Sequence, residues 1–290
     1  MIQGDCLKIL PTFKAESVDL VILDPPYIVN LDPNIQEKNR EAIIGIDNFL
    51  SLFKQSWRIL KNNRYLILFS HISTLFALHE QLYLAGFSYW LDLIWVKPIG
   101  VGFLNKTYSP LHRHETITIW KKGTPKFNAE ESKSHGEPYA RIGTNKPKPA
   151  EYHDSVLDIG HENSALRCMT TVLYYNHKPC LPMEERTVHP TQKPRKLMLR
   201  LVRAFSFPHS TVLDPFMGSG SVLSACQKRH RSCIGIEINS KYCSIVKKRY
   251  FGHTFLDHEV EYSLEIDVGL NGQASNGNGI GKELRDDYAR

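Results

Sequence analysis

The sequence LDPFMGSGS, from Leu213 to Ser221, has the pattern of a buried strand, a glycine-rich turn and the start of a helix. Gly218 and Gly220 allow backbone N–H groups to come close to a ligand at the N-terminus of that helix. The turn lacks the lysine of a Walker A loop and the third glycine of a dinucleotide fingerprint. The stretch therefore predicts a ligand site at a strand–turn–helix junction of an α/β fold.

Acidic residues around this turn narrow the choice of ligand. Glu237 lies near the end of the next predicted strand, at roughly the twenty-residue spacing at which a carboxylate reaches ribose hydroxyls. Asp214, directly before the turn, favours a ligand with a positive group over a pyrophosphate. Each acid alone also fits a structural role, Asp214 in the turn and Glu237 at a solvated strand end. The glycine turn and Glu237 together favour a ligand that contains adenosine.

Strand and helix patterns alternate along the rest of the chain, which predicts a doubly wound, mostly parallel sheet. The predicted strands are Ser17–Leu23, Arg64–Ser70, Tyr89–Val96, Glu115–Lys121, Thr211–Phe216 and Ser232–Ile238. The predicted helices are Cys6–Leu10, Asn48–Leu60, Thr74–Ala85, Lys196–Ser206, Ser221–Arg229 and Lys241–Tyr250. Because little sequence separates Tyr89–Val96 from Glu115–Lys121, we expect these two strands to pair antiparallel.

Composition sets wide bounds on function. The chain has 290 residues, of which 42% are hydrophobic, and a net charge of +6, so it is compatible with a polyanionic partner without requiring one. No signal-like segment and no run of membrane-spanning length is found, which predicts a cytoplasmic protein without a membrane partner. The six cysteines form no C-x-x-C pair, so we expect reduced thiols and no metal site; His177 and Cys180 have only weak zinc-ligand spacing.

A second motif, VILDPPYIVN, runs from Val21 to Asn30. Two adjacent prolines fix two φ angles and remove two hydrogen-bond donors, and the residue before each proline is kept out of helical geometry. Asp24 and Tyr27 are therefore predicted to be held on a stiff bracket at the end of a strand. A rigid turn after a core strand is the simpler explanation, but the motif does not stand alone.

DPPY, DPFMGSGS, IGIEIN and HPTQKP (His189–Pro194) together resemble the motif set of the DNA amino-methyltransferases. These enzymes use S-adenosylmethionine to methylate N6 of adenine or N4 of cytosine. The motif order is similar to that of the beta group, a circular permutation of the class I methyltransferase fold. The resemblance covers about residues 2–251 and implies a seven-stranded sheet of order 3-2-1-4-5-7-6. Thr211–Phe216 and Val18–Asp24 would then be neighbouring strands 1 and 4.

The resemblance also implies an organisation into four segments. Residues 1–123 would form the catalytic half of the methyltransferase domain, and residues 187–265 its cofactor-binding half. Residues 124–186, rich in Pro, Lys, Glu, His and Asn, would form an inserted target-recognition lobe. Residues 266–290, rich in Gly and Asn, are expected to be a disordered tail.

Site residues follow from the same resemblance. The catalytic residues would be Asp24, Pro25, Pro26 and Tyr27, with Asp24 and a bracket carbonyl accepting the two amine hydrogens and Tyr27 stacking on a flipped base. Thr191, Gln192 and Lys193 would lie by the methionine carboxylate of the cofactor. The cofactor-binding residues would be Asp5, Cys6, Asp24, Thr191, Gln192, Lys193, Asp214, Pro215, Phe216, Gly218, Ser219, Gly220, Ser221, Glu237 and Ile238.

The function predicted in this way is site-specific methylation of adenine N6 in double-stranded DNA, by direct in-line transfer from S-adenosylmethionine. N4-cytosine methylation is the alternative: DPPY favours adenine within the family, but Ile28 and Val29 follow it where the family often has Asn. Methylation of RNA or of a protein amide, a silent nucleic-acid-binding module and a nicotinamide dehydrogenase fit fewer of the motifs. A homodimer and a cognate restriction endonuclease stay open as partners.

Overall fold

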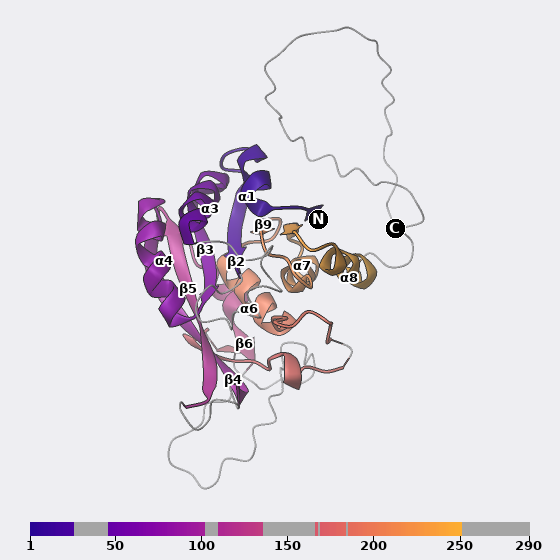
Figure 1. The fold of residues 1–290 in the computed structure, drawn as a ribbon. Coiled ribbons are helices and arrows are strands. Elements are labelled where there is room, and N and C mark those ends of the chain that lie inside the picture. The colour runs from indigo at the N-terminus through magenta and orange to yellow at the C-terminus, as the bar shows by residue number, and fades with distance from the viewer. Residues whose placement is uncertain (26–45, 102–109, 136–165, 168, 184, 251–290) are drawn as a thin grey trace, which may run out of the picture.

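A central mixed sheet organises the protein (Figure 1). The computed structural model describes residues 1–25, 46–101, 110–135, 166–167, 169–183 and 185–250. In sheet order the strands are β1 (Ile2–Gln3), β10 (Ser232–Glu237), β9 (Thr211–Asp214), β2 (Val18–Leu23), β3 (Leu60–Ser70), β5 (His112–Lys122), β4 (Ser88–Val101) and β8 (Val172–Tyr174). The strands from β1 to β3 are parallel, β5 is antiparallel to both β3 and β4, and β8 is parallel to β4.

This order confirms the predicted one and adds a strand, so the sheet has eight strands where seven were expected. The eighth, β8, covers the edge of β4 that would otherwise be unpaired. Ile94 N donates to Thr171 O at 2.8 Å, and Trp95 Nε1 donates to Tyr175 O at 2.9 Å. A strand of three residues is too short to show an alternating pattern, so the sequence pattern does not predict it.

Helices cover both faces of the sheet (Figure 1). One face holds α1 (Cys6–Ile9), α3 (Ile46–Ile59) and α4 (Ile72–Leu84), and the other holds α6 (Arg195–Phe205) and α7 (Ser221–Gln227). The remaining described elements are η1 (Leu10–Thr12), α5 (Ala129–Ser132), the antiparallel pair β6 (Ser134–His135) and β7 (Leu166–Arg167), η4 (Lys178–Cys180) and α8 (Ser240–Tyr250). The predicted helices are thus confirmed, with ends that differ by a few residues.

The two cores meet at β2. Val21 and Leu23 pack into the core under α3 and α4, whereas Leu20 and Ile22 pack into the core under α6 and α7. All of these side chains are buried, because successive residues of a strand point to opposite faces. The end of β2, where Asp24 follows, is therefore held from both sides.

The described parts of segment 124–186 lie against the main body. Its β8 belongs to the central sheet, and Asn128 Nδ2, at the start of α5, donates to Ser206 O at 3.0 Å. Arg231 also binds α5 to the main body, since its NH2 donates to Glu131 Oε2 at 2.8 Å. The interior of the predicted recognition lobe, residues 136–165, and the predicted tail, 266–290, lie outside the described residues.

Among the described residues, no helix is both long and apolar enough to cross a membrane. In the same part of the chain, no group of three or more His, Cys, Asp or Glu side chains is placed to hold a metal ion. Cys6, Cys226 and Cys243 are buried free thiols, and burial raises the pKa of Cys6 to about 12, with the neighbouring Asp5 adding to the rise.

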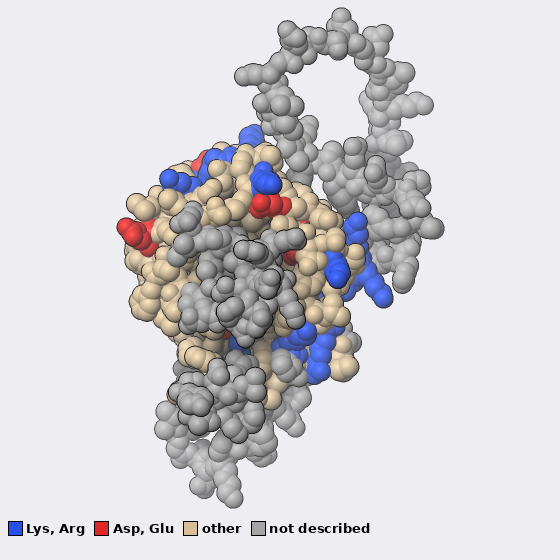
Figure 2. Space-filling model, viewed as in Figure 1, with Lys and Arg blue, Asp and Glu red and all other residues tan. Residues whose placement is uncertain are grey.

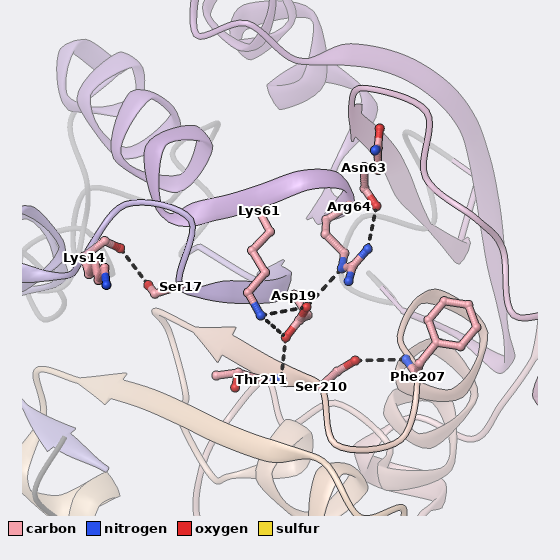
Figure 3. A network of polar contacts seen from close by, with 9 residues as sticks. All are labelled: Lys14, Ser17, Asp19, Lys61, Asn63, Arg64, Phe207, Ser210 and Thr211. Carbon is pink, nitrogen blue, oxygen red and sulfur yellow. Dashed lines mark hydrogen bonds and ion pairs between the residues drawn. The ribbon is translucent and has the colours of Figure 1, made fainter. Parts of the chain in front are cut away.

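Asp19 joins three strands at the amino edge of the sheet (Figure 3). Its Oδ2 accepts from Thr211 N on β9 at 3.0 Å, and its carboxylate pairs with Lys61 Nζ at 3.0 Å and Arg64 Nε at 3.1 Å on β3. Burial alone would raise the pKa of Asp19, but the Thr211 amide and the two cations outweigh it and lower the pKa. The ionised carboxylate thus stabilises the arrangement of β3, β2 and β9.

We predict that Asp19→Asn lowers the free energy of unfolding by roughly 1–3 kcal/mol, the usual range for a hydrogen bond to a buried charge. Because the pKa of Asp19 is lower in the folded state, its contribution is complete above the unfolded value of about 3.9 and is lost as pH falls through the folded value. Urea midpoints at neutral and acidic pH measure this: the gap to wild type should shrink in acid.

Glu130→Gln is the matched control, since Glu130 is exposed. Among the described residues, the Glu130 carboxylate pairs only with Lys133, the C-cap of α5. A gap between wild type and Asp19→Asn that persists below the folded pKa, or that Glu130→Gln reproduces, would contradict the role given to Asp19.

Candidate active site

The carboxyl ends of β2 and β9 open into one pocket. The two strands are adjacent and parallel, with Leu20 opposite Val212 and Val21 opposite Leu213, so Asp24 and Asp214 come to the same edge of the sheet. The pocket encloses about 360 Å³, part of it open to solvent. It is lined by Ile22, Asp24, His189, Thr191, Gln192, Lys193, Met198, Asp214, Phe216, Met217, Gly218, Ser219, Ser221 and Val222. Such a crevice beyond strand ends is where α/β folds bind ligands.

Glycine is required at both positions of the turn after β9. Gly218 has φ +52 and Gly220 has φ +78. A residue with a Cβ adopts these backbone angles only at a cost in free energy. A Cβ on Gly218 would lie 2.9 Å from His189 Nε2, and one on Gly220 would lie 2.7 Å from the Tyr250 ring. Gly218 therefore keeps the pocket wall thin, whereas Gly220 lets α8 pack against the start of α7.

Glu237 fixes the shape of this turn. Its Oε2 accepts from Gly218 N at 2.8 Å and its Oε1 accepts from Asn239 N at 2.8 Å. Burial raises the pKa of Glu237 even though these amides favour the charged form. Glu237 does not line the pocket but holds the glycine turn through Gly218 N. Contact of Glu237 with a ribose stays a prediction.

Asp214 is a buried acid in the pocket wall. Its Oδ1 accepts from Phe216 N at 3.1 Å. Burial raises the pKa of Asp214 to about 8, the Phe216 amide opposes this, and the negative charges of Asp24 and Glu237 add to it. At neutral pH this carboxyl group therefore holds its proton, and a positive group entering the pocket would favour its ionisation.

Asp24, which also lines the pocket, is paired with a lysine. Lys193 Nζ donates to Asp24 Oδ1 at 2.7 Å, and Pro25 directly after it is buried. Of the predicted catalytic residues, the structure thus places Asp24 and Pro25; Pro26 and Tyr27 lie outside the described residues.

The HPTQKP segment forms the third side of the pocket. Gln192 Oε1 accepts from Thr187 N at 2.8 Å and Gln192 Nε2 donates to Glu185 O at 2.8 Å, so this amide holds the loop together. Ser221 Oγ donates to Lys193 O at 2.7 Å, which fastens the segment to the first turn of α7. Thr191 is exposed at the rim.

The structure separates the predicted cofactor-binding residues into two groups. Those that line the pocket are Asp24, Thr191, Gln192, Lys193, Asp214, Phe216, Gly218, Ser219 and Ser221. Those that do not are Asp5, Cys6, Pro215, Gly220, Glu237 and Ile238. Asp5 follows β1, which lies beyond β10 at the edge of the sheet. Its Oδ1 accepts from Leu7 N at 2.9 Å and caps α1.

His189 was not predicted as a site residue, although it belongs to a quoted motif. Its ring centroid lies 4.4 Å from that of Tyr242, and its buried Nδ1 has no hydrogen-bond partner among the residues that the structure describes. Burial, with smaller contributions from Lys193 and Lys178, lowers the pKa of His189 to about 4. A neutral imidazole therefore lines the pocket at physiological pH.

Two further missed contacts come from residues distant in sequence. Arg249 near the end of α8 donates from NH1 to Ser219 O at 2.9 Å and from NH2 to Glu185 O at 3.1 Å, joining the glycine turn to the 185–193 loop. Behind Lys193 lies Glu115, whose Oε2 is 3.6 Å from Lys193 Nζ. The sequence indicated neither contact: Arg249 is one of several basic residues at the end of a helix, and Glu115 is a single acid in an apolar strand.

Comparisons with known proteins agree with this geometry. Type II methyltransferase M.HpaI of Haemophilus parainfluenzae is 29% identical over 252 residues, which cover 86% of this chain and 73% of that protein. Type II methyltransferase M.HinfI of Haemophilus influenzae is 24% identical over 269 residues, covering 86% of this chain and 67% of that protein.

Solved structures show the same fold. PvuII DNA methyltransferase, described as cytosine-N4-specific, superposes with a TM-score of 0.60 at 19% identity, covering 91% of this chain and 88% of that one. The M1.HpyAVI–SAM complex gives a TM-score of 0.56 at 24% identity, covering 86% of this chain and 97% of that one. The class I methyltransferase fold expected from the motifs is thereby confirmed.

The DNA methylase family of the N6/N4 type matches residues 18–248. This match includes β2 with the start of the DPPY motif, the glycine turn and most of α8. The chain belongs to this family of DNA methylases.

We predict that Gly218→Ala disturbs the pocket. A left-handed φ costs a residue with a Cβ about 1–2 kcal/mol, and the new Cβ would also displace His189. The urea midpoint should fall, and the environment of Tyr242, in contact with His189, should change in near-ultraviolet circular dichroism. Ser219→Ala in the same turn is the control; equal midpoints for the two variants would show that the turn tolerates a Cβ at 218.

Proposed function

We propose that this protein is a site-specific DNA methyltransferase that transfers the methyl group of S-adenosylmethionine to N6 of adenine. One observation carries the proposal: in a member of the N6/N4 DNA methylase family, the Asp24 carboxylate and the glycine turn face one pocket. The pocket thus offers an acceptor for an amine on one side and a cofactor cradle on the other.

The pocket chemistry fits S-adenosylmethionine. The cofactor carries a positive sulfonium and a positive amino group, and Asp214 can ionise beside them. Phe216, Met217 and Met198 supply apolar walls suited to an adenine ring. When bound, S-adenosylmethionine supplies an electrophilic methyl group. M1.HpyAVI and TTHA0409 of Thermus thermophilus are both described in complex with this cofactor.

The proposed role of Asp24 follows from the weak nucleophilicity of an exocyclic amine, whose lone pair is delocalised into the ring. Asp24 accepts a hydrogen bond from one amine N–H, and a backbone carbonyl of residues 24–26 accepts the other. These two bonds localise the lone pair and stabilise the positive charge that develops on nitrogen. Lys193 Nζ donates to Asp24 Oδ1 at 2.7 Å and so holds this acceptor in the pocket.

The choice of adenine rests on the aspartate of DPPY, whereas a serine in its place is associated with cytosine. N4-cytosine methylation is the alternative outcome, and the likeness to PvuII methyltransferase concerns the fold alone. A base flipped out of the duplex and stacked on Tyr27 completes the proposed complex.

Positive charge suited to DNA phosphates lies on α8. This helix contains Lys241, Lys247, Lys248 and Arg249 and no acidic residue. Figure 2 shows Lys and Arg side chains along the side of the molecule where α8 lies in Figure 1. Segment 124–186 is proposed to recognise the target sequence, and a homodimer or a partner restriction endonuclease is compatible with the likeness to type II methyltransferases.

The raised pKa of Asp214, about 8, predicts a pH-dependent affinity for S-adenosylmethionine. Binding of a cation favours the ionised carboxylate, so the affinity should rise as pH increases, by about tenfold between about pH 6.5 and about pH 8.5. Titration calorimetry in buffers of different ionisation enthalpy should show proton release. Asp214→Asn cannot ionise and corrects for the cofactor's own titration; an equal pH dependence in this variant would contradict the prediction.

We predict that Asp24→Ala lowers the single-turnover rate of methyl transfer by roughly 10²–10³, the effect of one preorganised polar group. Binding of cofactor and DNA should change little, because the glycine turn and the basic surface remain. Mass spectrometry of digested DNA identifies the product: N6-methyladenine supports the proposal, and N4-methylcytosine overturns the base assignment.

Asp92→Ala is the control for this variant, since Asp92 is exposed on β4 and contacts Tyr89. Near wild-type transfer by Asp24→Ala would show that Asp24 is not the acceptor of the amine.

A further inference from the structure

Four charged side chains of alternating sign lead from the pocket into the protein. Lys193 Nζ lies 2.7 Å from Asp24 Oδ1 and 3.6 Å from Glu115 Oε2. Glu115 Oε1 in turn accepts from Lys97 Nζ at 2.5 Å. The order is therefore carboxylate, ammonium, carboxylate, ammonium, and only the first member belongs to the DPPY motif.

The three inner members of this series, which we call the charge chain, are more deeply buried than Asp24. The side chain of Asp24 is 22% exposed, whereas those of Lys193, Glu115 and Lys97 are 7%, 11% and 9% exposed. Charges at this depth are costly unless each has a partner of opposite sign. The charge chain meets that condition, because its two positive and two negative groups balance.

Glu115 is ionised at any physiological pH. Burial alone would raise the pKa of Glu115, but the ammonium groups of Lys193 and Lys97 outweigh it and lower the pKa to about 2. Glu115 therefore carries a full negative charge between two cations, and it attracts Lys193 from the side opposite Asp24.

The sheet sets the position of the two inner members. Glu115 on β5 pairs directly with Trp95 on β4, and Lys97 is two residues further along β4, so all three share one face. The Lys97 ammonium lies 5.2 Å from the Trp95 ring centroid, and that of Lys193 lies 5.2 Å from the Phe69 ring centroid. Aromatic rings on strands thus flank both ammonium groups, a rigid and dry setting.

We propose that Glu115 and Lys97 are positioning residues for Asp24. Glu115 fixes the Lys193 ammonium, Lys97 balances the charge of Glu115, and Lys193 then holds Asp24 Oδ1 in one place in the pocket. The inference rests on the proposed function of Asp24 as the acceptor of the target amine. It gives Lys193 the role of orienting this acid, in place of the expected contact with the carboxylate of the cofactor.

The consequence of breaking the charge chain can be read from its charges. Glu115→Gln leaves Lys97 and Lys193 as two cations for one carboxylate, so the Lys193 ammonium is no longer drawn to its place. Lys97→Met leaves two carboxylates for one ammonium, and Asp24 loses part of its hold on Lys193. The double variant restores neutrality, with Lys193 and Asp24 as a simple pair.

The test is a double-mutant cycle with Glu115→Gln, Lys97→Met and their combination, measured by single-turnover methyl transfer to DNA and by calorimetric binding of S-adenosylmethionine. Each single variant should lower the transfer rate at least tenfold and leave the dissociation constant of the cofactor within about twofold. The double variant should lose less transfer rate than the product of the two single fold-losses predicts, because charge balance is restored.

Asp92→Asn on β4 and Lys121→Met on β5 are matched controls that remove the same charges outside the charge chain, and both should transfer at wild-type rates. Circular dichroism and thermal unfolding establish that each variant is folded. If Glu115→Gln alone does not fold, the neutral combination and the shorter Glu115→Asp still decide, since both keep the alternation of charge and should fold and retain activity.

Three results would overturn the inference: wild-type transfer by folded Glu115→Gln, a purely additive combination, or a loss carried by cofactor affinity. The Asp24→Ala background separates this inference from the proposed function. If Asp24→Ala abolishes transfer but Glu115→Gln does not slow it, only the positioning role fails. If Asp24→Ala transfers methyl groups normally, the proposed function fails. If Asp24→Ala and Glu115→Gln each slow methyl transfer, adding Glu115→Gln to Asp24→Ala should have little further effect.

Discussion

The pairing of β2 with β9 is the contact on which the site depends. Two pairs of residues, Leu20 with Val212 and Val21 with Leu213, define its register, and they bring together strands from opposite ends of the sequence. A shift of one residue would turn every side chain of β2 to the other face and aim Asp24 away from the pocket. The contact of Asp19 with Thr211 N fixes this register at the other end of the strands.

Three acids gather at the resulting edge, and the structure gives each a different state. Asp24 is paired with Lys193, Glu237 accepts two backbone amides, and Asp214 retains its proton because burial raises its pKa to about 8. Three ionised carboxylates at this edge of the sheet would repel each other strongly at low dielectric. The different partners resolve this conflict and leave one acid able to respond to a positive ligand.

The sequence predicted the order of the strands that carry the site through the resemblance of its motifs to the beta group, while the spacing of its apolar runs predicted the individual strands and helices. It could not predict β8, whose three residues show no period. It also did not predict that the Gln192 amide, which lines the pocket, makes two hydrogen bonds within its own loop. The ion pairs of Glu115 with Lys97 and Lys193 were not predicted, because they depend on the pairing of β4 with β5 and on the position of the 185–193 loop.

The distance in sequence between β2 and β9 has a consequence for synthesis of the chain. Asp19 and its partner Thr211 are 192 residues apart, so β2 leaves the ribosome with one edge unpaired long before β9 exists. Contacts of such separation form late and slowly, since a long loop must close first. The pocket can therefore form only after β9 and the glycine turn have been made. A nascent chain that ends before Thr211 contains Asp24 but has neither the glycine turn nor the strand β9 beside which Asp24 is placed.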